Sequence, residues 1–331
     1  MQRLKNLCMV AALGAIVMGG CLLQSTSASA ASIINVKAGG NTLSSALASA
    51  KSGDTIAISG TVTSGSVVVP AGVTISGTAG KGVINFSSST GRGLTINTKG
   101  STIKDLELYG AADNGIYMEG SGNNLINLKV HGNHDAGVQL SNGAANNTLT
   151  KVNSYSNADA KGENADGFAI KLHSGAGNTL TDCTAEGNSD DGYDLYAAHG
   201  AVTFTRCKAI NNGNCGGIKG DGNGFKVGGV DNKTPGVAAH LDPLKHVLID
   251  CTATGNTGSG FDRNNQNGVV TMTGCIGQKN GKNNFNFPLT GAPSALGGTT
   301  VTFGVAIMTK CTSIAGTNNI TGAKLSGCIG F

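Results

Sequence analysis

A short motif recurs along most of this chain at nearly regular intervals, and it limits the folds that are available. One apolar position recurs at Leu106, Leu128, Val152, Cys183, Cys207, Cys251 and Cys275, at intervals of 22, 24, 31, 24, 44 and 24 residues. Short apolar segments alternate with Gly/Asn turns, with no helical pattern between them. A period of 22 to 24 of this kind predicts an all-β fold, a parallel β-helix. Leucine-rich repeats need a denser leucine consensus than this chain has.

The recurring asparagines support the same fold. An Asn follows the apolar position by five residues in all copies but the first, at Asn133, Asn157, Asn188, Asn212, Asn256 and Asn280. Coils of a β-helix stack at about 4.8 Å, so identical positions form ladders. We expect these Asn side chains to bond from coil to coil and to adopt the left-handed conformation at a tight turn.

The start of the chain has a different pattern. Arg3 and Lys5 precede an apolar run over residues 7–23, and Ala28-Ser29-Ala30 resembles a cleavage site. This predicts a signal peptide over residues 1–30 and a secreted, extracellular protein, with one catalytic domain over 31–331. A lipobox ending at Cys21 fits less well, and no other apolar run is long enough to span a bilayer. We therefore expect no stable membrane association.

A short amphipathic helix is predicted next. Residues 42–51 carry Leu43, Ala46, Leu47 and Ala50 at helical spacing, with Thr42 or Asn41 as the N-cap. A strand follows at residues 55–58. We expect this helix to cap the open end of the solenoid.

Composition and net charge exclude some classes of function. The net charge is only +4, which excludes a strongly basic nucleic-acid-binding surface. The 53 glycines indicate turns rather than disorder, because 39% of residues are apolar and can form a core. We expect a monomer.

Seven cysteines follow the predicted signal peptide. Cys183, Cys207, Cys251 and Cys275 share one inward position, Cys311 and Cys328 have similar spacing, and Cys215 lies in an insertion. We favour a column of buried thiols that pack as small apolar side chains. Disulfides between neighbouring coils are the alternative.

Two enlarged turns interrupt the repeat. The interval from the recurring Asn to the Gly that precedes the next inward apolar residue is usually four residues, but it grows to ten before Gly167 and to twelve before Gly224. A further insertion spans residues 230–245. Because loops on a rigid scaffold often carry function, we expect the site on the coil between the enlarged turns.

Four carboxylates gather on that coil and the one before it: Asp166, Asp190, Asp191 and Asp194. Oxygen ligands without His or Cys favour Ca²⁺, or Mg²⁺ or Mn²⁺. Counting from each coil's Gly also predicts a column Ala169–Asp194–Lys226–Asp262. For the four acids, the alternative is a structural calcium site or a solvated turn. For Lys226, the alternative is an ion-pair rung in the column, in which the lysine pairs with Asp194 on one side and Asp262 on the other. A cation bound by Asp194 would instead lower the lysine pKa toward that of a general base.

The motifs that carry these residues resemble a known family. Asn-Ala-Asp-Gly-Phe (164–168), Ser-Asp-Asp-Gly-Tyr-Asp-Leu-Tyr (189–196), Gly-Asp-Gly-Asn-Gly-Phe-Lys-Val-Gly-Gly (220–229) and Gly-Phe-Asp-Arg-Asn (260–264) look like those of the right-handed β-helix pectate lyases of polysaccharide lyase family nine. The resemblance implies that Asp166, Asp190, Asp191 and Asp194 bind Ca²⁺ and that Lys226 is the catalytic base. It also implies an acidic polysaccharide partner, polygalacturonate, cleaved by β-elimination.

Two cations near this face are candidates for substrate binding. Arg263 and Lys171 could hold further carboxylates of the polymer, with a solvated surface charge as the alternative for each. His173 and His199 are interpreted as loop residues. The rival functions are a β-helix polygalacturonase, whose Gly-His-Gly element is missing here, and a non-catalytic polysaccharide-binding protein with structural calcium.

Overall fold

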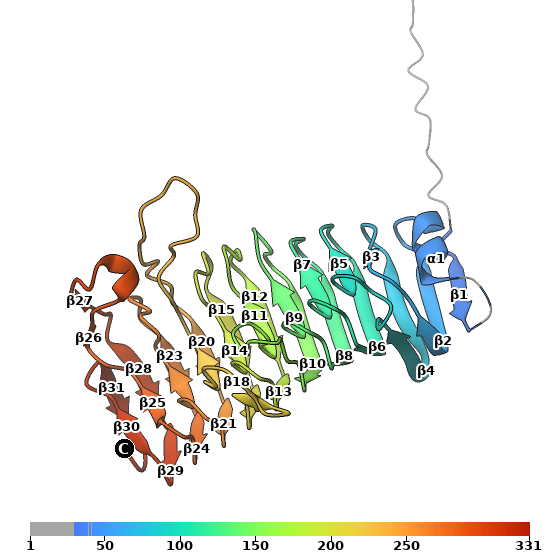
Figure 1. Cartoon of the computed structure of the whole chain (residues 1–331). Helices are drawn as coiled ribbons and strands as arrows, with labels where there is room; N and C mark the ends of the chain where they lie inside the picture. Colours follow the sequence, from blue (N-terminus) through green and yellow to red (C-terminus); the bar gives the residue numbers. More distant parts are fainter. Residues whose placement is uncertain (1–29, 39, 41) are drawn as a thin grey trace, which may run out of the picture. The chain divides into compact units, whose positions relative to one another are not determined.

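Two long parallel sheets carry the coils of the computed structural model, which describes residues 30–38, 40 and 42–331 (Figure 1). The larger has seventeen strands: β1 (Ile33–Lys37), β2 (Thr55–Thr63), β4 (Thr74–Asn85), β6 (Thr102–Tyr109), β8 (Asn124–His131), β10 (Thr148–Tyr155), β12 (Asn178–Thr181), β13 (Thr184–Glu186), β15 (Val202–Thr205), β16 (Lys208–Ile210), β20 (Val247–Ile249), β21 (Thr252–Thr254), β23 (Thr271–Thr273), β24 (Ile276–Gln278), β28 (Ala306–Thr309), β29 (Thr312–Ile314) and β31 (Ala323–Ser326). The smaller has ten: β3 (Val67–Val68), β5 (Leu94–Ile96), β7 (Ile116–Met118), β9 (Val138–Leu140), β11 (Phe168–Ile170), β14 (Tyr193–Asp194), β19 (Phe225–Lys226), β22 (Phe261–Asp262), β25 (Asn283–Asn286) and β30 (Thr317–Asn319).

The registers of these strands match the sequence repeat. Leu106 pairs with Leu128, and Leu128 pairs with Val152, so residues one repeat apart lie side by side. All pairings within these two sheets are parallel. The coils from β2 to β11 add one strand to each sheet, whereas the coils from β12 to β30 add two strands to the larger sheet and one to the smaller. The predicted parallel β-helix is confirmed.

A short helix lies at the N-terminal end of residues 31–331, as predicted. Helix α1 spans Leu43–Ser49, and the Oγ1 of its N-cap Thr42 accepts a hydrogen bond of 3.1 Å from the Ser45 N–H. Leu43, Ala46 and Leu47 are buried and pack next to β1, β2 and β3. The predicted signal peptide lies outside the described residues. Within the described ranges, no helix has the length and hydropathy needed to span a bilayer.

The asparagine ladder forms, but one part of the prediction is wrong. The Asn133 amide donates to Asn157 at 2.8 Å, and the chain of amide bonds continues through Asn188, Asn212, Asn256 and Asn280 to Asn284 at 2.8–2.9 Å. The left-handed conformation belongs to the residue before each of the six predicted ladder asparagines, such as Gly132 (φ 61°) or Ser156 (φ 52°). The Asn itself is therefore selected for its amide, which satisfies buried backbone groups.

A second ladder was not predicted. Asn123 donates to Asn147 and Asn147 to Asn178, at 3.3 and 3.1 Å, at another corner of the coils. Its residues precede strands rather than follow the recurring apolar position. The repeat motif that led to the first ladder therefore does not include them.

The thiol column is confirmed. Cys183, Cys207, Cys251, Cys275 and Cys311 are fully buried, and all seven cysteines from Cys183 onward are free thiols. Their backbone carbonyls accept bonds from the following coil, for example 2.9 Å from the Lys208 N–H to the Cys183 oxygen. These thiols pack as small apolar groups in the core.

Besides the enlarged turn before Gly167, three insertions leave the coils at their turns. One turn carries the hairpin of β17 (Asn214–Cys215) and β18 (Ile218–Lys219). Near the C-terminal end, β26 (Thr290–Gly291) pairs with β27 (Val301–Thr302) around the 3₁₀ helix η1 (Ser294–Leu296). Residues 230–245 form the long yellow-orange loop before β20 in Figure 1.

Candidate active site

The predicted column on the smaller sheet is present. Ala169 pairs with Asp194 across β11 and β14, Asp194 pairs with Lys226 on β19, and Lys226 pairs with Asp262 on β22. Parallel strands in register place these side chains on the same side of the sheet. Four consecutive coils therefore contribute to one outward-facing column.

The residues just before this column point into the core and hold the strands in place. Phe168, Tyr193, Phe225, Phe261 and Phe285 are fully buried and stack with ring centroids 4.5–5.0 Å apart. Because side chains alternate along a strand, an inward aromatic makes the next residue point outward. The aromatic stack thus fixes the direction of Asp194 and Lys226.

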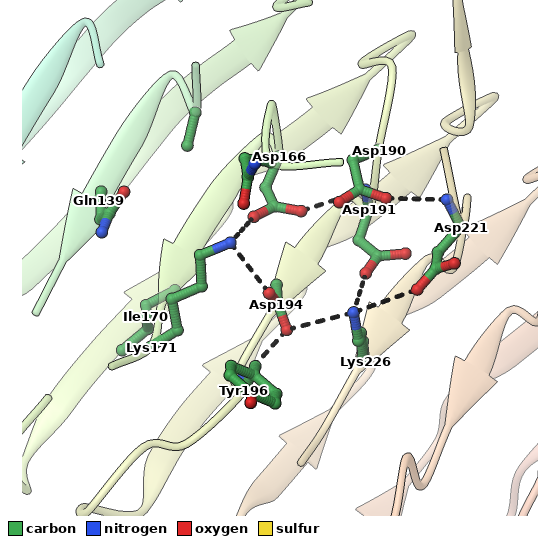
Figure 2. A network of polar contacts seen from close by, with 12 residues as sticks. Gln139, Asp166, Ile170, Lys171, Asp190, Asp191, Asp194, Tyr196, Asp221 and Lys226 are labelled. Atoms are coloured by element: carbon green, nitrogen blue, oxygen red, sulfur yellow. Dashed lines mark hydrogen bonds and ion pairs between the residues drawn. The ribbon is translucent and has the colours of Figure 1, made fainter. Parts of the chain in front are cut away.

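Three of the four predicted metal ligands share one small volume. Asp166, Asp190 and Asp191 each offer a carboxylate oxygen within 4.8 Å of the others, and their exposed fractions are 0, 3 and 0%. Asp194 lies beside them and is linked through two lysines (Figure 2). The structure therefore brings all four carboxylates to one place, with Asp194 at its edge.

The enlarged turn before β19 holds two of these carboxylates by backbone donors. The Asp221 N–H donates to Asp190 Oδ1 at 2.8 Å, and Asn223 donates to Asp191 Oδ1 through its N–H at 2.6 Å and its amide at 3.0 Å. Sequence reasoning assigned no role to Asp221 or Asn223. Both residues lie inside the Gly-Asp-Gly-Asn-Gly-Phe-Lys motif, and that position is the sequence feature that could have indicated a role in the site.

A glycine lets the two enlarged turns meet at this point. A Cβ on Gly220 would lie 2.1 Å from the Gly162 oxygen and 2.6 Å from Asp190 Oδ1. No side chain larger than hydrogen fits there without moving the carboxylate. The two insertions therefore form one wall next to Asp190.

The burial of these acids changes their ionisation. Burial and the charge of Asp191 raise the pKa of Asp190 to about 7, and burial raises the pKa of Asp191 to about 6 although Lys226 opposes it. Burial also raises the pKa of Asp166 well above its ordinary value, against the effect of Lys171. Burial would raise the pKa of Asp194 too, but Lys226 and Lys171 hold it below its ordinary value. Such a cluster favours a bound cation, which compensates like charges in a dry site.

Lys226 lies directly against the acids. Its Nζ is 3.0 Å from Asp191 Oδ2, 3.3 Å from Asp221 Oδ2 and 3.9 Å from Asp194 Oδ1. Its side chain is 13% exposed, so the ammonium is at the surface of the cluster. Burial would lower the pKa of Lys226, but Asp194 and Asp191 outweigh it and raise this pKa well above the ordinary value.

Lys226 does not form the alternative ion-pair arrangement. An ion-pair rung between Asp194 and Asp262 was the alternative, but Asp262 accepts instead from the Asn286 amide at 2.8 Å and the Asn264 N–H at 2.7 Å. The acidic partners of Lys226 are Asp191, Asp194 and Asp221. All three are on the side of the predicted metal ligands.

Lys171 is not a free surface cation, and its role in substrate binding stays a prediction. Its Nζ donates to Asp166 Oδ2 at 2.7 Å and to Asp194 Oδ2 at 3.1 Å, and its side chain is only 9% exposed. Burial would lower its pKa, but the two carboxylates outweigh burial and raise it. Lys171 is a buried counter-ion that holds Asp166 and Asp194 together.

Arg263 does not lie on the outward face of the column. It is 1% exposed, and its guanidinium donates to the carbonyls of Gln266, Gly304 and Gly322 at 2.8–3.1 Å. Strand alternation explains this: Arg263 follows Asp262 as Val227 follows Lys226, and both second residues point inward. Arg263 ties the coil of β22 to the C-terminal coils.

Replacing Arg263 by alanine is expected to lower the free energy of unfolding by about 2–4 kcal/mol, because three buried carbonyls lose their donor. Equilibrium denaturation measures the change. Arg206→Ala is the matched control: its side chain is 53% exposed and pairs with Asp182 at 2.7 Å, so the expected loss is within about 1 kcal/mol. Equal losses in the two variants would contradict the structural role of Arg263.

The geometry defines a class of protein: a parallel β-helix with a cluster of carboxylates that could hold a cation, beside a lysine. A family model described as "Pel9A-like, right handed beta helix region" matches residues 23–295. The chain belongs to this family. This confirms the resemblance to family-nine pectate lyases and the right-handed form of the fold.

Individual relatives agree with this assignment. Pectate lyase L of Paenibacillus polymyxa (strain SC2) is 35% identical over 62% of this chain, and pectate lyase L of Dickeya dadantii (strain 3937) is 33% identical over 54%. The chain covers only 49% and 41% of these two relatives. The crystal structure of pectate lyase Pel9A has a TM-score of 0.76 and 26% identity, covering 91% of this chain and 80% of that chain.

Proposed function

We propose that this protein is a secreted, calcium-dependent pectate lyase that cleaves α-1,4-linked polygalacturonate by β-elimination. The observation that carries this function is the position of Lys226, 3.0 Å from Asp191 in an oxygen-only cluster on the outward column. Family membership supports the reaction class, and the predicted signal peptide supports secretion. The acidic polymer is the proposed partner of a monomeric enzyme.

The residues present fit a calcium ion. Asp166, Asp190 and Asp191 offer close oxygen atoms with no His or Cys among them, and Asp194 stands next to them. Asp191 Oδ2 is buried and makes no hydrogen bond, its contact with Lys226 being an ion pair without hydrogen-bond alignment. Hard oxygen donors select calcium over transition metals. We propose these four aspartates as the ligands.

Lys226 is the proposed general base. Its pKa is raised by the charges of Asp194 and Asp191, so a cation that neutralises those carboxylates removes the cause of the shift. What then remains is burial, which lowers the pKa of a lysine. The amine would become able to accept a proton when the cation site is filled.

The reaction follows from this base. When bound, calcium would neutralise the C6 carboxylate of a galacturonate residue and acidify its C5 proton. Lys226 removes that proton, the electron pair of the C5–H bond forms the C4–C5 double bond, and the C4–O bond breaks. The departing oxygen takes a proton from solvent and becomes the hydroxyl of the other fragment, and Lys226 then returns its proton to solvent. Asp221, 3.3 Å from Nζ and largely exposed, lies where it can accept a hydrogen bond from the protonated lysine. The product carries a 4,5-unsaturated end, and no water is consumed.

A single assay tests this function. The full chain is incubated with polygalacturonate, with and without calcium, and the ultraviolet absorbance of the unsaturated product is followed. We expect absorbance to rise only with calcium. New reducing ends without that absorbance would indicate a hydrolase, and polymer binding without depolymerisation would indicate a non-catalytic binding protein.

Exchanging Lys171 for methionine tests its role as counter-ion. Without Lys171, Lys226 is the one lysine of the described residues that still pairs with the four carboxylates. Bound calcium should therefore raise the Tm more in Lys171→Met than in the wild type. Thermal unfolding with and without calcium measures this difference. Lys129→Met, an exposed lysine on β8, is the control. An unchanged calcium response with a higher KM for polymer would return Lys171 to substrate binding.

A further inference from the structure

A second cluster of metal-ligand side chains lies away from the four aspartates. His199, Asp231, His240 and Asp242 each offer one donor atom, and all four atoms lie within 4.8 Å of one another. His199 comes from the turn after β14, and the other three come from the insertion of residues 230–245. Sequence reasoning interpreted His199 as a loop residue and gave the other three no role.

The spacing of the donors suits a small tetrahedral ion. His199 Nε2 lies 3.0 Å from Asp231 Oδ2 and 3.8 Å from Asp242 Oδ2, and His240 Nε2 lies 3.9 and 3.7 Å from the same two oxygens. Donors bound to zinc at about 2.0–2.2 Å in tetrahedral geometry are separated by about 3.3–3.6 Å. One of the four distances is shorter than this range and three are longer. Small side-chain shifts would therefore bring the donors to zinc-binding separations.

Hydrogen bonds around the cluster orient two of its side chains, His240 and Asp231, for binding a metal. His240 Nδ1 lies 3.0 Å from the Ala238 carbonyl, which can only accept, so Nδ1 carries the proton and the neutral ring presents a lone pair at Nε2. Asp231 is 1% exposed and is fixed by the Thr234 hydroxyl at 2.6 Å and the Lys233 N–H at 2.8 Å. An oriented imidazole and an anchored carboxylate are typical of metal ligands.

Ion pairing alone does not account for the arrangement. Among the four cluster residues, only the His199–Asp231 pair has hydrogen-bond length, and the other three His–Asp distances of 3.7–3.9 Å are too long for N–H···O bonds. His173, outside the cluster, adds a contact of 3.4 Å from its Nε2 to Asp231 Oδ1. Asp242 Oδ2 is shut off from solvent and has no hydrogen-bond partner. A buried carboxylate oxygen without a donor is costly unless a cation binds it.

We propose that His199, Asp231, His240 and Asp242 bind a divalent transition metal, with Zn²⁺ as the fitting ion. Two imidazoles with two carboxylates suit zinc and distinguish this site from the oxygen-only cluster. The metal would fasten the insertion to the coil of β14. The base of the insertion is already closed by the paired backbones of Asp231 and His240, at 2.9 and 3.0 Å.

The site also connects to the column. The Tyr196 hydroxyl bonds to Asn232, next to Asp231, while the Tyr196 N–H donates to Asp194 Oδ1 at 3.0 Å. Fastening the insertion would therefore stiffen one side of the region next to Asp194. The role is structural, and it does not depend on the proposed lyase activity.

Calorimetric titration of the full, untagged chain with Zn²⁺, in saturating calcium, tests the site. We expect one zinc per chain, more than about 100-fold weaker binding in His240→Ala, and unchanged binding in His134→Ala, an exposed histidine outside the cluster. Asp191→Asn should keep zinc binding, because it alters only the oxygen cluster. With Co²⁺ as the probe, wild type but not His240→Ala should give the visible absorption of a four-coordinate ion.

A second measurement follows the loop itself. Lys233 and Lys245 are exposed in the insertion, so trypsin cleavage reports its mobility. Zinc should slow cleavage at these lysines in the wild type and in His134→Ala, but not in His240→Ala. Absence of zinc binding by the wild type, equal binding by His240→Ala, or loss of binding in Asp191→Asn would each overturn the proposal.

Discussion

Lys226→Ala is expected to reduce kcat on polygalacturonate by about 100- to 10,000-fold, the range by which a general base contributes to rate. Lys226 is on the outward column, and removing it leaves the buried aromatic stack and the four carboxylates in place. Calcium affinity should be retained or increase, since one cation beside the acids is lost. Product absorbance gives kcat, and calorimetry gives the calcium affinity.

The control for this variant is Lys208→Ala, an exposed lysine on β16 of the same coil. It should leave both kcat and calcium affinity unchanged. Substantial activity in Lys226→Ala, with the fold intact by circular dichroism, would show that another group removes the proton.

Asp191→Asn is expected to weaken calcium binding by about 100-fold or more, because a buried carboxylate of the cluster loses its charge. The substitution keeps the shape of the side chain and a carbonyl that can accept from Asn223. Activity at limiting calcium should fall in parallel and recover in part at high calcium. Calcium titrations monitored by activity and by calorimetry should therefore shift together.

Asp250→Asn serves as the matched change, because Asp250 is exposed and asparagine tolerates its left-handed conformation (φ 52°). Its calcium response should equal that of the wild type. If Asp191→Asn lost activity without losing calcium affinity, Asp191 would not be a calcium ligand. Full activity after chelation with EGTA would remove calcium from the mechanism altogether.

The repeat made most of the fold predictable from the sequence. In a β-helix, one register determines every ladder, so the column of Ala169, Asp194, Lys226 and Asp262 followed from counting from the glycines. The four aspartates could be grouped for the same reason. Periodicity, rather than local propensity, carried this information.

The errors arose where the direction of a side chain or the path of a loop decides the outcome. Arg263 could have been placed inward by the alternation that places Val227 and Leu195 inward, and Lys171 could have been placed near Asp194 because it lies two residues after Ala169. The cluster of His199, Asp231, His240 and Asp242 had no such signal. It depends on the path of the insertion of residues 230–245. This insertion has no repeat, so counting along the repeat cannot predict which of its side chains meet.

The in-register stacking of coils has a consequence for how such proteins can change in length. Thr102 pairs with Asn124, so excising the 22 residues Thr102–Asn123 would present matching neighbours to each other across the new junction. The β-helix would be one coil shorter, but its sheets would still be continuous. Excision between Asp166 and Lys226 would also leave a continuous spiral, but it would delete the residues on which the proposed chemistry depends. Variation in the number of turns is therefore compatible with an unchanged reaction only toward the two ends of the spiral.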